Sequence, residues 1–590
     1  MPPFIYVLIF GLLARAGETR LPSERDQWIE VRTDHFTFFS NASQKQSLEI
    51  AQNLERFRAL LAFIRPGGEI VQPLPTKVFV FKQSRAFAPY RMWRGTIERS
   101  LQGYFLRHPH GNYIAMNATP RQEEPEAVLF HEMFHAYARH NLIGIPLWLE
   151  EGLAEYHKTF RVLSNKLHLG VPIPWHVVLL RTHGTMPLKV LFEIDADSDE
   201  YREFEKKGMF YAQCWALVHY LLSGNEDLAP RFPALLDAFA AGSETEPALA
   251  SALGLDLDQL ERQLLGYVHG AHFPTLSLES GRLRFSDNAD VRGLSHAEAL
   301  SRLGELLAHC GPEAAEDARA HFLAALEIEP QQPEVFTGLA VLADGAGQTD
   351  EVERLAQIAV SMGAKEALPY YLGADSILRR SGDVASLEQA RSLLQQAILL
   401  APGFGELHFL LGQTFFKDPN RAAEGVSHFK KAMALLPDRG DIGINLARLY
   451  LNLEQWQEAD ELVSKLSQSH QDSKSAAELK ELLERKRWVS EVNAALIAGD
   501  AAMVREIFDR GVEAGIDPTL LDRVSAELRN MENNVLVDSK EARYNRAVGL
   551  LNEGKDDEAR EILLELDQEL EDGALKRAVF ILLRRLHQKP

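Results

Sequence analysis

The sequence of 590 residues has little of what would place it in several common protein classes. It contains only two cysteines, Cys214 and Cys310, too few for the disulfide framework of a small secreted domain. We expect both to be buried thiols that pack as small hydrophobic side chains. Beyond the N-terminal segment no 18 consecutive residues are apolar, so we expect no integral membrane segment in the mature chain.

Basic residues are also in the minority, with 63 Lys and Arg against 84 Asp and Glu and a formal net charge of -21. Because phosphates repel an acidic surface, nucleic acid is not expected as a partner. An excess of carboxylates is typical of solvated helix surfaces. A chain of this length exceeds what one hydrophobic core organises, and two to four domains are expected.

Residues 1–16 predict a signal peptide. Phe4 to Leu13 is an apolar run of the right length, and Ala14-Arg15-Ala16 has the small-residue pattern of a cleavage site. No Lys or Arg precedes the apolar run, so an uncleaved anchor stays open as an alternative. We therefore expect an exported protein, either periplasmic or secreted.

Residues 22–124 predict a small mixed sheet with one covering helix. Residues 28–40 are rich in β-branched and aromatic side chains, which is typical of strand, turn and strand. Residues 43–64 place apolar side chains at helical spacing. Residues 103–117 read as a β-hairpin, and its second strand, 112–117, leads towards the following helix. A free edge on that strand would allow an extended peptide to pair with it, although an ordinary internal strand is an equal alternative.

The turn of this hairpin reads His108-Pro109-His110-Gly111. Histidines on either side of a proline in a turn are usually exposed to solvent, so we do not expect His108 and His110 to bind a metal.

The stretch from His131 to Glu155 carries the strongest chemical signal. His131 and His135 frame Glu132 in an H-E-x-x-H pattern, and two imidazoles four residues apart on a helix can bind one metal ion. Glu132 lies within reach of a metal-bound water, as a general base must. Glu151 on the next helix would complete a His-His-Glu set with an open fourth position.

Two more carboxylates accompany this set. Glu155 shares the helix face of Glu151 and is placed to accept a hydrogen bond from a ligand histidine. Glu150 points to another side of the helix, where we expect solvent or a local ion pair. Glu150 and Glu155 remain the alternatives to Glu151 as third ligand.

The pattern H-E-x-x-H at 131–135 followed by WLEEGLAEY at 148–156 resembles the gluzincin (peptidase MA-like) zinc metallopeptidases. The resemblance implies an α+β zincin-like catalytic domain, with residues 22–124 as its sheet and 125–270 as its helical zinc-binding part. It implies one Zn²⁺ ion held by His131, His135 and Glu151, Glu132 as general base, and Glu155 as the carboxylate that orients a ligand histidine.

The resemblance also bears on catalysis. Gluzincins carry a tyrosine in a similar downstream helix, so Tyr211 is our candidate donor to the oxyanion, with core packing as the alternative. His219 in the same helix is expected to be a core histidine. The spacing from His135 to Glu151 is shorter than in the aminopeptidase branch, and no G-x-M-E-N signature precedes the motif. These departures favour an endopeptidase.

From residue 295 the chain is almost continuously helical, after a predicted linker at 271–294. The segments HFLAALEIEP, LLQQAILLAP and HFKKAMALLP align as equivalent helices, and Pro402 and Pro437 are separated by close to the period of about 34 residues. The segments resemble tetratricopeptide repeats. The resemblance implies an all-α solenoid at 295–470, a helical connector at 471–540 and further repeat-like helices at 541–590.

Together these features predict an exported zinc metallopeptidase that hydrolyses a protein or peptide substrate, with a repeat groove that binds a protein partner. The alternative is a binding protein, in which the repeats carry the function and the zinc domain is catalytically idle.

Overall fold

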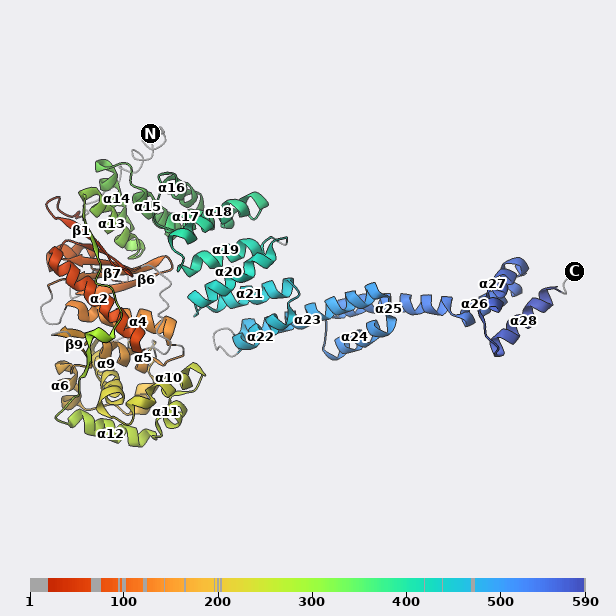
Figure 1. The fold of residues 1–590 in the computed structure, drawn as a ribbon, viewed down its shortest axis with the longest axis horizontal. Coiled ribbons are helices and arrows are strands. Elements are labelled where there is room, and N and C mark those ends of the chain that lie inside the picture. Colours follow the sequence, from red (N-terminus) through yellow and green to blue (C-terminus); the bar gives the residue numbers. More distant parts are fainter. Residues whose placement is uncertain are drawn as a thin grey trace. The chain divides into compact units, whose positions relative to one another are not determined.

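A computed structural model describes residues 20–64, 76–93, 96–97, 102–119, 125–142, 144–163, 166–195, 197–198, 201, 204–418, 420–437, 439–467 and 473–587. The predicted signal peptide lies outside these residues. The chain divides into two compact units, Met1–Leu446 and Ala447–Pro590 (Figure 1). None of the described helices is both long enough and apolar enough to cross a bilayer.

The first unit is built on a six-stranded mixed sheet. The strands lie in the order β11 (Asp290–Leu294), β1 (Trp28–Arg32), β2 (Phe36–Ser40), β3 (Thr76–Phe81), β7 (Gly111–Asn117) and β6 (Gly103–His108). The β2–β3 and β3–β7 pairs are parallel, whereas the other pairs are antiparallel. The predicted strand pair at 28–40 and the predicted hairpin at 103–117 are therefore confirmed.

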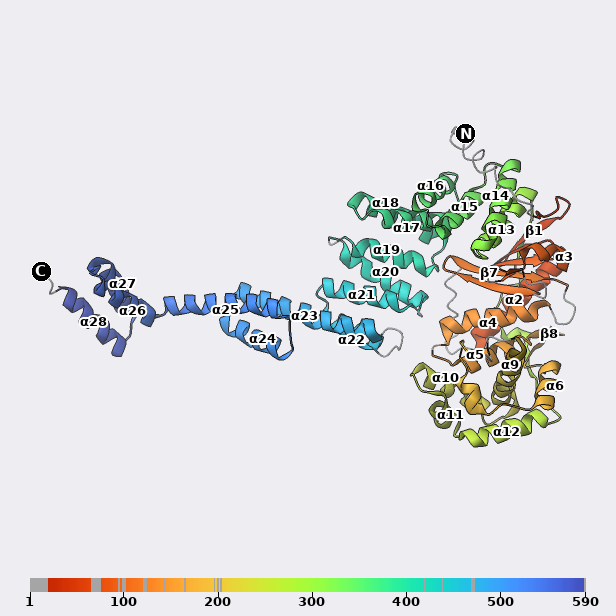
Figure 2. The same ribbon diagram turned by 180° about the vertical axis from the view of Figure 1, so that it is seen from behind.

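The two faces of the sheet bury different layers, as β3 illustrates. Val78 and Val80 point to the face covered by α2 (Gln44–Ile64), which is the predicted covering helix. Phe79 and Phe81 point to the opposite face and share a core with α13 (His296–Ala308) and the helices that follow it. Figures 1 and 2 show α2 and α13 on opposite sides of the sheet. The alternation along β3 thus joins the sheet to the helical repeats in one unit.

Two expectations about this region require correction. The segment 271–294 is no simple linker, because it supplies β10 (Leu276–Glu279), which pairs with β9, and β11, which pairs with β1. The strand at 112–117 has no free edge, because β7 pairs with β3 on one side and β6 on the other. The edge next to β7 belongs to β6 instead.

The part of the chain that follows β7 and precedes the repeats in sequence is mainly helical. A small antiparallel sheet consists of β8 (Arg161–Leu163), β9 (Lys166–Leu169) and β10. The helices are α4 (Pro125–Asn141), α5 (Leu147–His157), α6 (Pro174–His183), α7 (Leu188–Glu193), α9 (Phe204–His219), α10 (Phe232–Ala240), α11 (Thr245–Leu253) and α12 (Leu257–His269).

Antiparallel helix pairs follow from residue 296. They are α13 with α14 (Ala315–Ile328), α15 (Pro333–Gly345) with α16 (Thr349–Ser361), α17 (Leu368–Arg380) with α18 (Val384–Leu400), and α19 (Gly405–Phe416) with α20 (Ala422–Leu435). Small residues sit where helices cross: a Cβ added to Gly338 in α15 would lie 2.1 Å from Cζ of Phe322. This contact explains why the repeat pattern requires a small side chain there.

The helix α21 (Gly440–Asn452) spans the border between the two units. The second unit continues with α22 (Trp456–Ser467), α23 (Ser473–Ala498), α24 (Ala501–Glu513), α25 (Pro518–Asp538), α26 (Lys540–Asn552), α27 (Asp556–Glu569) and α28 (Ala574–His587). Small apolar cores within its described residues include one around Trp488 in α23 to α25 and one around Leu563 in α26 to α28.

Candidate metal centre

The predicted metal motif lies on two consecutive helices, α4 and α5. The chain turns between them at Gly144, which has a φ of +72°, and a Cβ there would lie 2.6 Å from the carbonyl oxygen of Phe239. Only glycine meets both conditions without strain. Pro146 precedes α5 as its N-cap, as the sequence predicts for a second helix.

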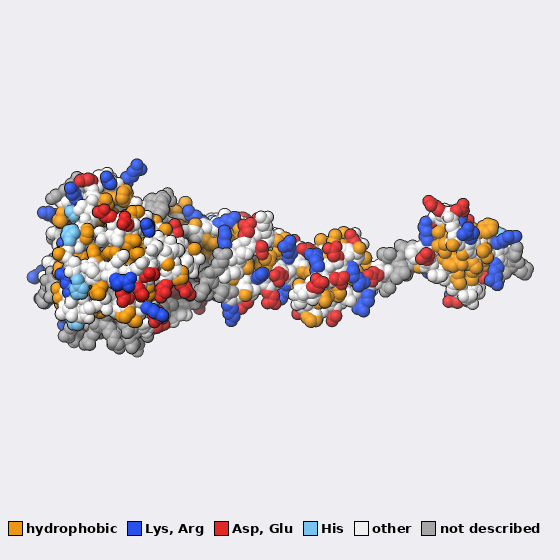
Figure 3. Space-filling model, turned by 90° about the horizontal axis from the view of Figure 1, so that it is seen from below, with side chains coloured by type: hydrophobic (Ala, Val, Ile, Leu, Met, Phe, Trp, Pro, Cys, Tyr) orange, Lys and Arg blue, Asp and Glu red, His pale blue; other side chains and the backbone are white. Residues whose placement is uncertain are grey.

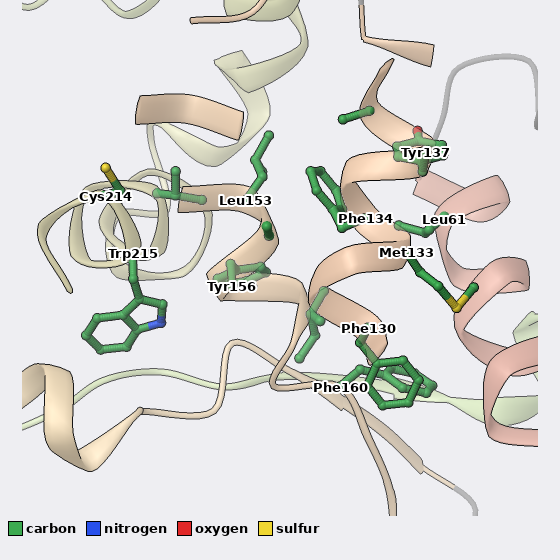
Figure 4. Packing of buried hydrophobic residues seen from close by; sticks show 14 of the residues in the cluster. Leu61, Phe130, Met133, Phe134, Tyr137, Leu153, Tyr156, Phe160, Cys214 and Trp215 are labelled. Atoms are coloured by element: carbon green, nitrogen blue, oxygen red, sulfur yellow. The ribbon is translucent and has the colours of Figure 1, made fainter. Parts of the chain in front are cut away.

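A continuous apolar core fixes the two helices against each other and against α9. The ring of Phe134 in α4 stacks on His157 in α5, with 4.5 Å between ring centroids. Figure 4 shows the cluster close up, with Phe130, Met133, Phe134 and Tyr137 of α4, Leu153 and Tyr156 of α5, and Cys214 and Trp215 of α9. The polar side chains on the other face of α4 and α5 therefore have a rigid support.

Three of these polar side chains converge. Nε2 of His131 lies 3.1 Å from Nε2 of His135, and the two nitrogens lie 3.6 Å and 3.4 Å from Oε2 of Glu151. A tetrahedral zinc ion with ligand distances of about 2.1 Å has edges of about 3.4 Å between its ligands. The triangle thus has the size that one such ion requires, and the three residues fit the metal implied by the resemblance.

The third member of the triangle, Glu151, carries an atom that supports this fit. Oε2 of Glu151 is buried and accepts no hydrogen bond from the described residues. A buried carboxylate oxygen without a partner is energetically costly, and coordination of a cation would remove the cost. The other oxygen, Oε1, accepts a hydrogen bond of 2.9 Å from the hydroxyl of Tyr201.

Two further carboxylates lie next to the outer nitrogens of His131 and His135. Nδ1 of His131 lies 3.1 Å from Oε1 of Glu155, the residue expected in this role. Nδ1 of His135 lies 2.9 Å from Oε1 of Glu150. The hydrogen bond to Glu150 favours the tautomer of His135 in which Nδ1 carries the proton and Nε2 faces the centre of the triangle. Nδ1 of His131 lies close to Glu155 but forms no hydrogen bond with the described residues.

The electrostatics of the triangle favour a positive charge. Burial opposes protonation of His135, but the hydrogen bond to Glu150 and the nearby charge of Glu151 outweigh it and raise the pKa of His135 to about 10. Burial raises the pKa of Glu151, but its contacts with His135 and His131 outweigh this effect and hold that pKa below its ordinary value. A cation that binds here would displace a proton from His135.

Glu132 and Tyr211 border the triangle. Glu132 follows His131 on α4 and is half-buried. The ring of Tyr211 on α9 lies 6.1 Å from that of His131. Burial and the negative charge of Glu151 raise the pKa of Tyr211 above its ordinary value, so its phenol keeps its proton and can donate a hydrogen bond. Base and oxyanion donor are the roles predicted for Glu132 and Tyr211 from the sequence.

Sequence reasoning missed several contacts of the site. Glu150, expected at the surface or in a local pair, contacts a ligand histidine from the following helix. Tyr201 lies in an acidic stretch without periodicity, where nothing in the sequence marks it. Glu155 also contacts Nζ of Lys158 at 2.7 Å and Nε2 of His176 at 2.6 Å. The spacing of Lys158 three residues after Glu155 was the one available signal for these contacts.

The predictions for His219 and the two cysteines are confirmed, whereas the prediction that His108 and His110 are exposed is wrong. His219 is a core histidine, with Nδ1 2.7 Å from the hydroxyl of Tyr267 and Nε2 2.7 Å from the carbonyl oxygen of Gly170. Cys214 and Cys310 are both buried and free. His108 and His110 are not exposed turn residues: His110 is 8% exposed and His108 is half-buried, because α13 covers the hairpin.

Comparison with known proteins concerns the repeats. The tetratricopeptide repeat family matches residues 417–483, and no curated protein matches the chain. Similar solved structures include a thermophilic TPR protein from Thermus thermophilus, with 25% identity over 32% of this chain and 98% of that chain and a TM-score of 0.24. YrrB, a TPR protein with an unusual peptide-binding site, has 20% identity over 31% of this chain and 92% of that chain, with a TM-score of 0.27. PilF of Pseudomonas aeruginosa has 16% identity over 39% of this chain and 97% of that chain, with a TM-score of 0.26. The C-terminal half of the chain therefore contains tetratricopeptide repeats, as predicted.

Proposed function

We propose that the first unit is a zinc-dependent metallopeptidase of the gluzincin type, acting as an endopeptidase. The observation that carries the proposal is the triangle of His131, His135 and Glu151, whose ligand atoms lie 3.1 to 3.6 Å apart around a buried, unpartnered carboxylate oxygen. Glu155 and Glu150 lie next to the outer nitrogens of the two histidines, carboxylates that a chance H-E-x-x-H match would lack.

The residues around the triangle divide the chemistry between them. Zinc, when bound, supplies a Lewis acid that activates water and polarises the scissile carbonyl. Glu132 accepts the proton of the attacking water and delivers it to the leaving amine. Tyr211 donates a hydrogen bond from its phenolic hydroxyl to the developing oxyanion. Tyr201 orients Glu151 through the hydrogen bond to its Oε1.

The edge strand β6 offers a place for an extended substrate. It ends the six-stranded sheet and packs against α4, the helix that carries both histidines. A peptide that paired with the main chain of β6 would gain affinity with little demand on its sequence, as an endopeptidase requires.

The repeats suggest a second function, protein binding. A cleft of about 860 Å³ lies between the sheet and the repeats of the first unit, lined by Lys77 and Tyr113 of the sheet and by Arg302, Glu366 and Phe404 of the repeats. In the second unit Phe580 and Ile581 are 59% and 63% exposed, and Figure 3 shows hydrophobic side chains gathered over its C-terminal helices. Such surfaces suit a protein partner or a substrate segment.

The test compares the full-length protein with Glu132→Gln. We expect both to have the same zinc content by mass spectrometry, and only the wild type to cleave casein, with activity reduced at least about 100-fold in the variant. Glu126→Gln on the same helix is the matched control and should keep full activity. Equal cleavage by the wild type and Glu132→Gln would contradict the proposal. Zinc binding without any cleavage by the wild type would favour the scaffold function.

A further inference from the structure

Three histidines outside the candidate centre meet between the sheet and the repeats. His108 and His110 flank the turn of the β6–β7 hairpin, and His309 directly follows α13. One ring nitrogen from each of the three lies within 4.8 Å of the others. The ring of His108 lies 4.7 Å from that of His110 and 4.6 Å from that of His309, measured between centroids.

Two of the three rings carry buried nitrogens without partners. Nδ1 of His110 and Nε2 of His309 have no hydrogen-bond partner among the described residues, and these side chains are only 8% and 7% exposed. His309 uses its other nitrogen, because its Nδ1 lies 2.8 Å from the carbonyl oxygen of Glu305. That contact requires the proton on Nδ1, so Nε2 presents a lone pair. Histidine ligands of metals are typically held in this way.

The three imidazoles lie in surroundings that lower their pKa values. Burial, together with His108, lowers the pKa of His309 to about 3, and burial and the neighbouring histidines lower the pKa of His110 well below its ordinary value. Burial also lowers the pKa of His108, against the opposing charge of Asp344. Neutral imidazole is the form that binds a metal ion.

We propose that His108, His110 and His309 form a second metal site, which binds a divalent transition cation such as Zn²⁺. Imidazole suits Zn²⁺, Cu²⁺ and Ni²⁺, whereas Mg²⁺ and Ca²⁺ prefer oxygen ligands. A tetrahedral ion requires nitrogen separations of about 3.4 Å, so small ring rotations complete the site. The half-buried position of His108 leaves room for water as the fourth ligand.

The charged neighbours of the site permit a cation. Arg379 and Lys77 oppose it, but each is already paired with carboxylates. Arg379 contacts Asp344 at 2.9 Å, and Lys77 contacts Glu305 at 2.6 Å and Glu366 at 2.7 Å. The fields of these cations are therefore largely compensated within the protein.

A cation at this site would clamp the first repeat helix onto the sheet. His108 and His110 belong to the hairpin that contains the edge strand β6, whereas His309 belongs to the end of α13. Binding would therefore tie the hairpin to the repeats, at a distance in sequence from the triangle of His131, His135 and Glu151.

The experiment uses the full-length chain with the first centre removed by His135→Gln and Glu151→Gln. We expect this background to bind one Zn²⁺ per chain by calorimetry and to give the visible absorption of nitrogen-coordinated Co²⁺. His309→Phe in the same background keeps an aromatic ring against Tyr113 and should weaken binding more than about 100-fold, since even groups that merely orient a ligand contribute about 10- to 100-fold.

Two further variants make the result decisive. His108→Gln changes the most exposed ligand, so it should fold normally and also lose the Co²⁺ absorption. His428→Gln alters a histidine pair elsewhere, whose Nδ1 atoms lie 3.2 Å apart, and should bind as the background does. Hydrogen exchange in residues 103–117 should slow when Zn²⁺ is added. A background protein that binds no cation, or His108→Gln and His309→Phe variants that bind as tightly as the background, would overturn the proposal whether or not the peptidase assignment stands.

Discussion

Glu150 and Glu151 are adjacent in sequence but face different atoms of the candidate centre. Oε2 of Glu151 points at both Nε2 atoms, whereas Glu150 contacts only the outer nitrogen of His135. We predict that Glu151→Gln lowers zinc affinity by more than about 100-fold, whereas Glu150→Gln lowers it by about 10-fold to 100-fold. Competition with a fluorescent chelator measures both. A larger loss in Glu150→Gln would identify Glu150 as the third ligand.

Tyr211 and Tyr201 are neighbours to which we assign different roles, because Tyr201 donates a hydrogen bond to Glu151 and the ring of Tyr211 lies close to that of His131. We predict that Tyr211→Phe lowers kcat by about 100- to 1,000-fold at unchanged zinc content, the loss typical of an oxyanion donor. Tyr201→Phe should instead weaken zinc binding, with kcat retained at saturating zinc. Wild-type kcat in Tyr211→Phe would assign this residue to core packing, the alternative raised by its sequence context.

At the scale of elements, the position of α5 depends on Gly152, the residue after Glu151. A Cβ at this position would lie 2.5 Å from the carbonyl oxygen of Cys214 and 2.6 Å from Cγ2 of Val218, both in α9. Gly152→Ala should therefore push α5 and α9 apart and lower the free energy of unfolding by about 2 kcal/mol, since overpacking outweighs the better helix propensity of alanine. Zinc affinity should fall with it, as Glu151 moves.

Gly266 in α12 provides the matched control for this substitution. It is exposed, and a Cβ there would meet no atom within 4 Å. Gly266→Ala should stabilise the protein by up to about 1 kcal/mol, the difference in helix propensity. Chemical unfolding of both variants measures the contrast, and equal effects would show that the α5–α9 contact is looser than the geometry indicates.

Helices and strands whose apolar residues recur at regular spacing were predictable from the sequence. The helix at 44–64, the hairpin at 103–117 and the helices that carry His131 and Glu151 follow from local patterns of apolar residues, prolines and glycines. The strand at 290–294 was missed, because DVRGL alternates weakly and acquires its structure from pairing with β1. Its strand character is imposed by tertiary context, which overrides local propensity.

At the scale of the whole chain, the contacts that sequence reasoning missed are those between distant residues. The two histidines of the H-E-x-x-H motif are four residues apart, so the sequence alone predicts that they lie on one face of a helix. His110 and His309 meet only because α13 packs on the outer face of the sheet. No local sequence pattern predicts this contact, because it depends on how the layers of the first unit pack on one another.

The sheet and the repeats of the first unit also share an ion network, which should make the stability of this unit depend on pH. Glu366 contacts Nζ of Lys77 in β3 at 2.7 Å and Nη1 of Arg302 in α13 at 2.7 Å. Burial raises the pKa of Glu366, but the charges of Arg302 and Lys77 outweigh it and hold that pKa well below its usual range. Its ionised form is thus favoured in the folded state.

We predict that this contribution is complete above the unfolded pKa of a glutamate, about 4.3, and is lost as the pH falls through the lower folded pKa. Glu366→Gln should cost about 2 kcal/mol at pH 7, less than the about 3 to 5 kcal/mol of a fully buried pair, because this side chain is 36% exposed. The loss should shrink as the pH falls below about 4, when the wild type also loses the charge. Urea unfolding across this range measures the effect, and the exposed Glu424→Gln is the control, which should change the stability little. A pH-independent loss would show that Glu366 acts through packing and not through its charge.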